Sequence, residues 1–188
     1  MAREKVLCGK EEIIRVAVSI VDGEGIDALT TKSLSEELRV SRMTIYNYVD
    51  NLNEIKKMVL TSGFDRMYAY IYQALREEDP DDKISLCRTL ARSVFRFSMK
   101  NKNIFAYMFY EGRSLFSEDA EIRPFYTFFT KFTKRAQSAQ EYSENRVAYE
   151  MLDIMVFSIA HQCAAGINVI TESEFNEKLE FFLKKCLN

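Results

Sequence analysis

The side chains of greatest chemical interest lie between Thr30 and Val49, in the run TTKSLSEELRVSRMTIYNYV. Its second half carries an arginine, hydroxyl groups and tyrosine rings where an ordinary surface helix carries a solvated charged face. A helix that enters the DNA major groove uses its first turns for base edges and its flanks for phosphates. The forked guanidinium of Arg42 suits guanine, and the hydroxyls of Thr44 and Tyr46 suit phosphates. Taken alone, the run fits DNA contact and a surface helix with incidental aromatics about equally well, because short helical pairs are common, and the flanking sequence is needed to favour DNA contact.

Local signals in this run indicate where its helices begin and which side each helix buries. Thr30 can begin a first helix because its hydroxyl can accept a hydrogen bond from a free first-turn amide. Leu34 and Leu38 lie four residues apart and share one face of that helix. Ser41 can cap a second helix, whose buried side includes Ile45. The pattern predicts two short helices joined by a tight turn.

Amphipathic helices are expected on both sides of this pair. The preceding one includes Glu12–Val21 and ends at Gly23 or Gly25, because glycine readily adopts the left-handed conformation that terminates helices. Asn51 can cap a following long helix that runs to near Arg76. Three N-terminal helices and a long fourth helix are therefore expected.

Four motifs in this region resemble, in order and spacing, the DNA-binding domain of the tetracycline-repressor (TetR) family. They are Ile-Ile-x-x-Ala from Ile13, Glu-Gly-Ile-Asp-Ala-Leu-Thr-Thr-Lys from Glu24, Leu-x-Val-Ser from Leu38, and Thr-Ile-Tyr-x-Tyr-Val from Thr44. The match runs from about residue 11 to residue 60, and the remainder is similar only in length and helical character. The resemblance implies an all-α fold of about nine helices, with a three-helix helix-turn-helix domain over residues 1–50. Residues 51–188 would then form a helical ligand-binding and dimerisation domain.

The resemblance also implies which side chains touch DNA. Two positions depart from the family pattern: Arg39 stands where glycine is common at a positive φ, and Leu52 stands where a lysine commonly meets a phosphate. A non-glycine residue in the left-handed conformation costs on the order of 1 kcal/mol. Lys56 and Lys57 lie a turn beyond Leu52 and are expected to compensate for the missing lysine. The predicted DNA contacts are Thr31, Lys32, Ser41, Arg42, Met43, Thr44, Tyr46, Asn47, Tyr48 and Lys56.

Composition limits the class of protein. A chain of 188 residues with 47% hydrophobic and 29% charged residues is long and apolar enough to form a folded core. Its net charge of −2 argues against a general nucleic-acid coat protein, but a sequence-specific binder needs only a local basic patch. The four cysteines form no paired motif, and the N-terminus shows no basic-then-apolar leader, so a cytoplasmic location is expected. No segment matches a membrane span of about 20 apolar residues.

A dense aromatic block between residues 84 and 135 predicts a pocket for a small apolar or aromatic molecule. Aromatic residues at helical spacing are also typical of an ordinary core, and that alternative stays open for each of them. Glu111, embedded in the block, is either a solvated edge residue or a partner for a bound cation. The residues assigned to the pocket are Phe64, Met67, Phe97, Phe105, Met108, Phe109, Phe125, Phe129 and Met151.

The helix expected over Glu144–Ile170 is apolar around most of its circumference, which predicts burial on both sides. A last helix follows, begun by a capping box of Thr171 and Glu174. Two such helices from each of two chains would form a four-helix homodimer interface, although a monomer with a thick core would show the same pattern. The residues assigned to the interface are Met155, Ile159, Gln162, Cys163, Phe175, Leu179 and Phe182.

Catalytic and metal chemistry find little support in the sequence. His161 is the only histidine, and Cys163, two residues on, would point to a different helix face. No nucleophile–base pair or phosphate-binding glycine loop is visible, so neither an enzyme nor a cofactor nor a metal is expected. A helical enzyme acting on an aromatic substrate remains a distant alternative.

Together these features predict a dimeric transcriptional regulator, most simply a repressor. A small apolar or aromatic effector would release it from a palindromic double-stranded DNA operator. The departures at Arg39 and Leu52, with the acidic net charge, leave one alternative open. It is a helical interaction module with a weakened DNA-reading head that acts through a partner regulator.

Overall fold

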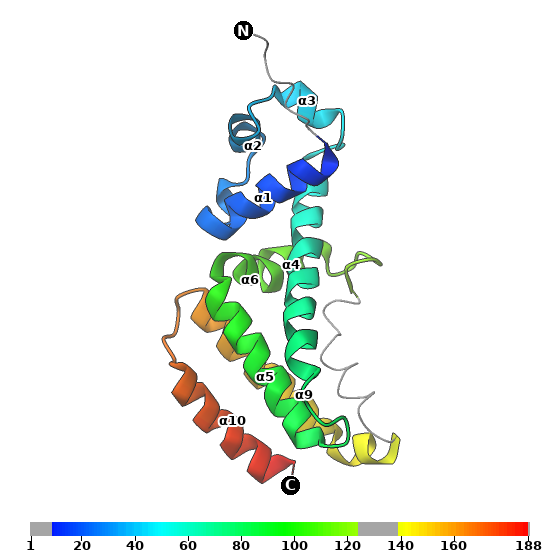
Figure 1. The fold of residues 1–188 in the computed structure, drawn as a ribbon, viewed down its shortest axis with the longest axis vertical. Coiled ribbons are helices and arrows are strands. Elements are labelled where there is room, and N and C mark those ends of the chain that lie inside the picture. The colour runs from blue at the N-terminus through cyan, green and yellow to red at the C-terminus, as the bar shows by residue number, and fades with distance from the viewer. Residues whose placement is uncertain (1–8, 124–138, 188) are drawn as a thin grey trace.

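Helices form all of the regular structure in the residues that the computed structural model describes, which are 9–123 and 139–187. This confirms the predicted all-α class, and the predicted pocket residues Phe125 and Phe129 lie outside the described residues. In chain order (Figure 1) the helices are α1 (Lys10–Glu24), the 3-10 helix η1 (Ile26–Ala28), α2 (Thr31–Glu37), α3 (Arg42–Tyr46), α4 (Leu52–Leu75), α5 (Lys83–Lys100), α6 (Lys102–Phe109), α7 (Glu111–Phe116), α9 (Ala139–Ala164) and α10 (Glu172–Cys186).

The helices begin at the capping residues that the sequence indicated. Thr30, Ser41 and Asn51 cap α2, α3 and α4, each accepting a hydrogen bond from the backbone N–H three residues later at 3.0–3.1 Å. The predicted capping box of Thr171 and Glu174 starts α10. Each cap satisfies a first-turn amide that has no partner within its own helix, so it fixes the start of that helix.

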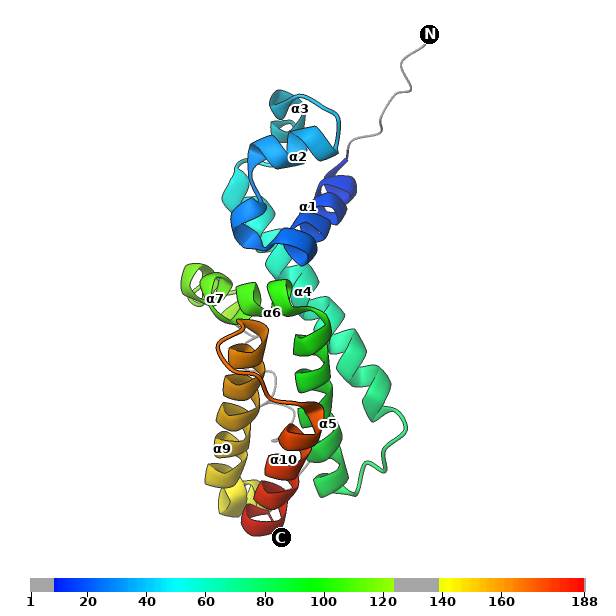
Figure 2. The same cartoon turned by 90° about the vertical axis from the view of Figure 1, so that its left-hand side faces the viewer.

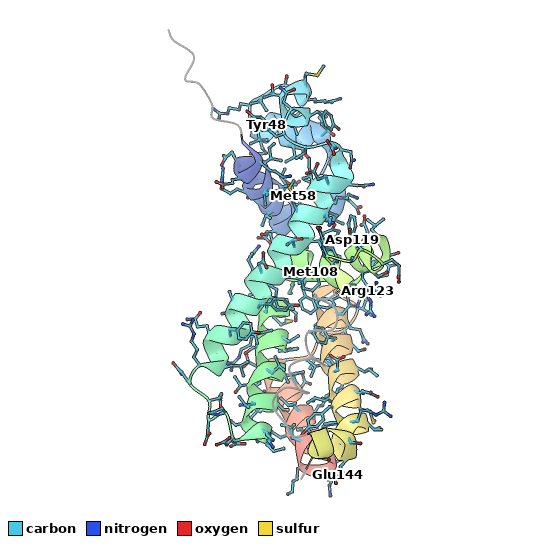
Figure 3. The ribbon with its side chains drawn as sticks, turned by 90° about the vertical axis from the view of Figure 1, so that its right-hand side faces the viewer. Tyr48, Met58, Met108, Asp119, Arg123 and Glu144 are labelled. Atoms are coloured by element: carbon cyan, nitrogen blue, oxygen red, sulfur yellow. The ribbon has the colours of Figure 1, made fainter. Side chains whose placement is uncertain are left out.

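Helix α4 links the two ends of the molecule. We call α1, η1, α2 and α3 the head, and α5, α6, α7, α9 and α10 the body. Helix α4 runs from the head down along the body (Figures 1 and 2), and α1, α5, α6 and α7 all pack against it. Its buried side chains extend from Ile55 near the head to Ile71 in the body. Figure 3 shows Tyr48 at the head end and Glu144 at the far end of the body.

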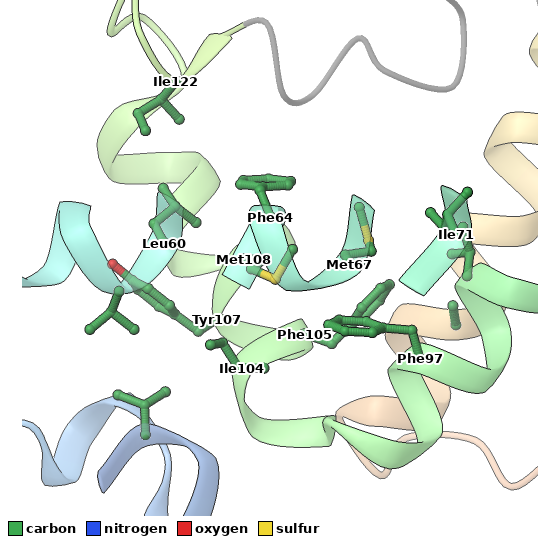
Figure 4. Packing of buried hydrophobic residues seen from close by; sticks show 14 of the residues in the cluster. Leu60, Phe64, Met67, Ile71, Phe97, Ile104, Phe105, Tyr107, Met108 and Ile122 are labelled. Carbon is green, nitrogen blue, oxygen red and sulfur yellow. The ribbon is translucent and has the colours of Figure 1, made fainter. Parts of the chain in front are cut away.

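The core of the body forms where α4 faces α5, α6 and α9. Phe64 and Met67 of α4 lie beside Phe105 and Met108 of α6 (Figure 4), and all four are almost completely buried. Phe105 and Phe109 have ring centroids 4.6 Å apart, and Phe157 of α9 lies 4.8 Å from Phe109. These rings are packed against one another at the spacing typical of aromatic pairs in a protein interior.

Two glycines allow the close approach of α4 to α6 and α7. A methyl group built on Gly63 would lie 2.8 Å from the sulfur of Met108, and one built on Gly112 would lie 2.9 Å from the backbone oxygen of Tyr107. The first obstacle is a flexible side chain, but the second is backbone and cannot move aside cheaply. No pattern in the sequence predicts this constraint, because it depends on which helices cross.

A ladder of ion pairs holds α10 against α5. Arg88, Arg92 and Arg96 follow one another at intervals of one turn along α5. Arg88 and Arg92 contact Glu180 at 2.7 and 3.0 Å, and Arg96 contacts Glu172 at 2.6 Å. The hydrogen bond from Arg88 lowers the pKa of Glu180. Because these pairs are partly exposed, their main effect is to set how α10 lies on α5, and their effect on stability is modest.

Helix α9 differs from its predicted bounds of Glu144–Ile170. It begins at Ala139 and ends at Ala164, because Gly166 adopts a positive φ of 71°. The Ile167 N–H donates to the carbonyl of Gln162, and the Gly166 N–H donates to that of Cys163, which completes a Schellman motif. Within the described ranges, no helix is long and apolar enough to cross a membrane.

The orientation of α9 bears on the residues predicted for the ligand pocket and the dimer interface. Leu152, Val156 and Ala160 are buried against the rest of the chain, so the opposite face is the exposed one. Met151, which was assigned to the ligand pocket, lies on that outward face and is 53% exposed. Three residues assigned to the dimer interface are instead buried within the single chain, and the other four are only partly buried. The buried three are Cys163, Phe175 and Leu179; the partly buried four are Met155, Ile159, Gln162 and Phe182.

Replacing Gly112 by alanine should lower the free energy of unfolding by about 1–3 kcal/mol, because the new methyl group would press on the backbone of α6. Chemical denaturation monitored by circular dichroism measures this change. Gly23→Ala is the matched control, since Gly23 lies in α1 and nothing approaches the added methyl within 4 Å. That variant should be neutral or slightly more stable. Equal effects at both positions would contradict the crossing argument.

Candidate DNA-binding surface

The predicted helix pair is present at the head end of the molecule. Helices α2 and α3 pack on each other, and α2 packs on α1. Leu34, Leu38, Ile45 and Val49 form their buried side. Because α3 is only five residues long, its position depends on this apolar contact and on its N-cap, Ser41. The opposite side of α3 faces away from the rest of the protein.

The turn between α2 and α3 is a second Schellman motif. The Val40 N–H donates to the Ser35 carbonyl at 3.1 Å, and the Arg39 N–H donates to the Glu36 carbonyl at 3.2 Å. This pattern requires the intervening residue to be left-handed, and Arg39 has a φ of 54°. The positive φ expected at Arg39 is therefore confirmed. Among the described residues other than glycine, Arg39 alone has this conformation.

A hydrogen bond ties the two helices together at their outer edge. Thr31, at the start of α2, and Tyr46, at the end of α3, have their hydroxyl oxygens 2.9 Å apart. The Tyr46 side chain is still 43% exposed, so the bond positions the ring without burying it. Thr44 is more enclosed, with its hydroxyl 2.9 Å from that of Ser41. The hydroxyl groups of Thr44 and Tyr46 are therefore held in place by hydrogen bonds within the protein.

Nine of the ten predicted DNA contacts lie together on this end of the head. Met43 is 74% exposed and Tyr48 is 44% exposed, so both side chains are accessible to a partner. Lys32 lies 3.9 Å from Glu36 across one turn of α2, a weak and exposed pair. Within the described part of the chain, Arg42 has no ion-pair partner. The nine residues are Thr31, Lys32, Ser41, Arg42, Met43, Thr44, Tyr46, Asn47 and Tyr48.

The tenth predicted contact, Lys56, is engaged elsewhere. Its ammonium group lies 3.0 Å from the carboxylate of Glu111, and its side chain is only 19% exposed. Lys57 is paired with Asp119 at 2.8 Å, so it is not a free phosphate ligand either. Leu52 packs against the core. Both nearby lysines are therefore paired with acidic residues in this structure, and their compensation for Leu52 stays a prediction.

The predicted pocket residues of α4, α5 and α6 form packed core. Phe64, Met67, Phe97, Phe105 and Met108 are each at most 3% exposed, and Phe109 is partly buried against them. Asp153 of α9 is a half-buried acid on the body that the sequence did not single out. Burial raises the pKa of its carboxyl to about 6, and the charge of Arg113 opposes that shift. The assignment of the predicted pocket residues of α4, α5 and α6 to a ligand site stays a prediction.

Metal ligands do not gather in the described residues. No group of three or more histidine, cysteine or acidic side chains there is arranged to hold a metal ion. Cys87 and Cys163 are buried and Cys186 is exposed, all three as free thiols. His161 stacks on Tyr110 with ring centroids 6.1 Å apart.

Comparison with known proteins supports the resemblance seen in the sequence. No model of a known protein family matches the chain. Over 89 residues, 47% of this chain, it is 24% identical to the HTH-type transcriptional regulator YobS of Bacillus subtilis. That match spans about half (45%) of the relative's length. The crystal structure of a TetR-like transcriptional regulator from Rhodococcus sp. RHA1 superposes with a TM-score of 0.68 at 13% identity, covering 100% of this chain and 98% of that one. The chain therefore has the TetR-like fold.

Replacing Arg39 by glycine should raise the free energy of unfolding by about 0.5–1 kcal/mol relative to Arg39→Ala. Both variants remove the guanidinium, but only glycine relieves the left-handed strain at the turn. Urea denaturation of the two variants side by side isolates the backbone effect from the loss of charge. An alanine variant as stable as the glycine variant would show that the turn is not strained.

Proposed function

We propose that the chain is a DNA-binding transcriptional regulator, most simply a repressor, that acts as a homodimer and is released from its operator by a small effector. The observation that carries the proposal is the exposed side of α3. It presents Arg42, Met43 and Tyr46 to solvent on a helix held in place by a cap, a Schellman turn and an apolar underside. An exposed arginine with no ion-pair partner in the described residues, beside exposed aromatic rings, suits base edges and thymine methyl groups.

The electrostatics of the head favour sequence-specific binding over general attraction to DNA. Phosphate contacts supply most non-specific affinity, and they need free lysines and arginines. Lys56 and Lys57 are paired with body carboxylates, and the whole chain carries a net charge of −2. Binding would therefore depend on a few base contacts from each head and on two heads acting together.

Exposed apolar side chains on α9 support a dimer. Val147, Met151 and Ile154 are 53–68% exposed along one face of α9, and Phe181 of α10 is 68% exposed. Both helices pack on α5. Pairing this face with its copy in a second chain would remove the apolar surface from water and give the two-fold symmetry that a palindromic operator needs.

The ion pairs of Lys56 and Lys57 also favour a second candidate function. A head without free lysines at the start of α4 can serve as a protein-interaction surface that acts through a partner regulator. Leu52→Lys separates the two functions. In a DNA-binding protein the new ammonium should tighten operator binding and increase its dependence on salt. An adaptor would show no operator in either form.

Selection of bound duplexes from a random DNA pool should enrich a near-palindromic site. Arg42→Ala should weaken binding to the selected site about tenfold or more, because a bidentate arginine–guanine contact is worth about 1–3 kcal/mol. Arg76→Ala is the matched control, since Arg76 is an exposed arginine at the far end of α4. Equal affinity of wild type and Arg42→Ala would show that α3 is not the recognition helix.

Ile154→Glu should convert the dimer into a folded monomer, because it places a charge in the centre of the proposed apolar interface. Light scattering coupled to size exclusion gives the mass directly. Leu115→Glu is the control, since Leu115 is an exposed apolar residue on α7, 50% accessible and away from α9. A variant at Ile154 with an unchanged dimeric mass would place the interface elsewhere.

A further inference from the structure

A groove of about 490 Å³ lies where the head meets the body. Asp27 and Gly25 line it from the head, Tyr110 lines it from the end of α6, and His161 and Ala165 line it from the end of α9. This volume is within the range of small-molecule sites, about 300–1,000 Å³. None of the residues assigned to a ligand pocket from the sequence contributes to it.

The groove is electronegative. Asp27 has no hydrogen bond or ion pair within the described part of the chain, and the second lining carboxylate, Glu111, is paired with Lys56. No lysine or arginine lines the groove. The carboxyl ends of α1, at Gly25, and of α9, just before Ala165, border the groove, together with the amino ends of the short helices η1 and α7. A helix carboxyl end carries a partial negative charge, which favours a bound cation.

The walls of the groove are mainly apolar and aromatic. The Tyr110 side chain is 75% exposed, the highest value for a tyrosine among the exposed large side chains of the described residues. Its ring stacks beside that of His161 at 29°, with centroids 6.1 Å apart. Ring faces beside carboxylates attract organic cations, because the negative face of the ring adds to the carboxylate charge. Tyr110 and Asp27 both line the groove, so it offers an aromatic ring and a carboxylate to one bound molecule.

The contacts beside the groove join the head to the body. Arg66 of α4 lies 2.6 Å from the carboxylate of Asp22 in α1 and donates to the side chain of Asn101 at 2.7 Å. The Asn103 amide donates to the backbone oxygen of Asp22 at 2.9 Å. A molecule in the groove touches the end of α1 and the start of η1 on one side and α6 and α9 on the other. Its binding therefore stabilises one orientation of the head relative to the body.

We propose that this groove is an effector site for a small aromatic cation, held between Tyr110 and Asp27, that fixes the orientation of the head. Ligand binding at the groove stands independently of DNA binding. Its regulatory consequence rests on the proposed function and identifies the chemical class of the effector.

The test measures binding of two probes to the full chain without DNA, by isothermal titration calorimetry. 1-Naphthylmethylamine is the aromatic cation, and 1-naphthylmethanol is its neutral counterpart with the same ring. The cation should bind about fivefold more tightly than the alcohol. Asp27→Asn should remove that preference and leave the alcohol unchanged, whereas Tyr110→Ala should weaken both probes. Tyr72→Ala is the matched control, because Tyr72 is an exposed tyrosine of α4 outside the groove.

Hydrogen exchange then locates the bound cation. The Gly25 amide donates to Val21, and the Leu29 amide donates to Ile26, both at 3.0 Å beside the groove. Both amides should exchange more slowly with the cation present, and Ala165→Trp, which fills the groove from an exposed position, should abolish the effect. No binding of the cation, equal binding to wild type and Asp27→Asn, or binding without slower exchange at these amides would each overturn the proposal. Because none of these measurements includes DNA, failure to find an operator would not affect them.

Discussion

The close crossing of α4 with α6 and α7 is the constraint on which the rest of the structure depends. Gly63 and Gly112 leave no space for a side chain, so α4 lies against the body with little freedom to shift. The same helix continues into the head, where Ile55 and Val59 are completely buried. The way in which α4 crosses α6 and α7 in the body therefore sets the position of the head. A change in that crossing would therefore move α2 and α3 relative to the body.

Features set by neighbouring residues were predicted correctly from the sequence. The caps at Thr30, Ser41 and Asn51, and the left-handed turn at Arg39, each depend on residues within one helical turn. These features can be predicted without knowledge of the fold, because a hydroxyl or amide side chain three residues before a free backbone N–H commonly caps a helix. The nine clustered residues that are predicted to contact DNA share this local origin, since they lie on or beside two short adjacent helices.

Features set by tertiary contacts were not predicted. Lys56 and Glu111 are 55 residues apart, so nothing local shows that one neutralises the other. The circumference of α9 is apolar almost throughout, and the sequence could not say which side faces α5. The residues predicted for the interface are therefore buried or half-buried within the single chain, whereas Val147 and Ile154 on the outward face are exposed. The groove was missed for the same reason, because its walls come from three separate segments.

The pairing of Lys56 and Lys57 with the body has a consequence for regulation. Lys56 and Lys57 lie on α4 next to the head, and each is paired with an acidic residue. Their positive charges are therefore not available to DNA phosphates. A head that lacks this unspecific attraction must rely on base contacts, which depend steeply on orientation. The proposed groove lies beside Glu111, the partner of Lys56. A cation held at Asp27, as proposed, would place its positive charge in the same groove as Glu111 and so weaken the attraction between Glu111 and Lys56. The proposed effector site and the α4 lysine would then be linked through the carboxylates of one groove.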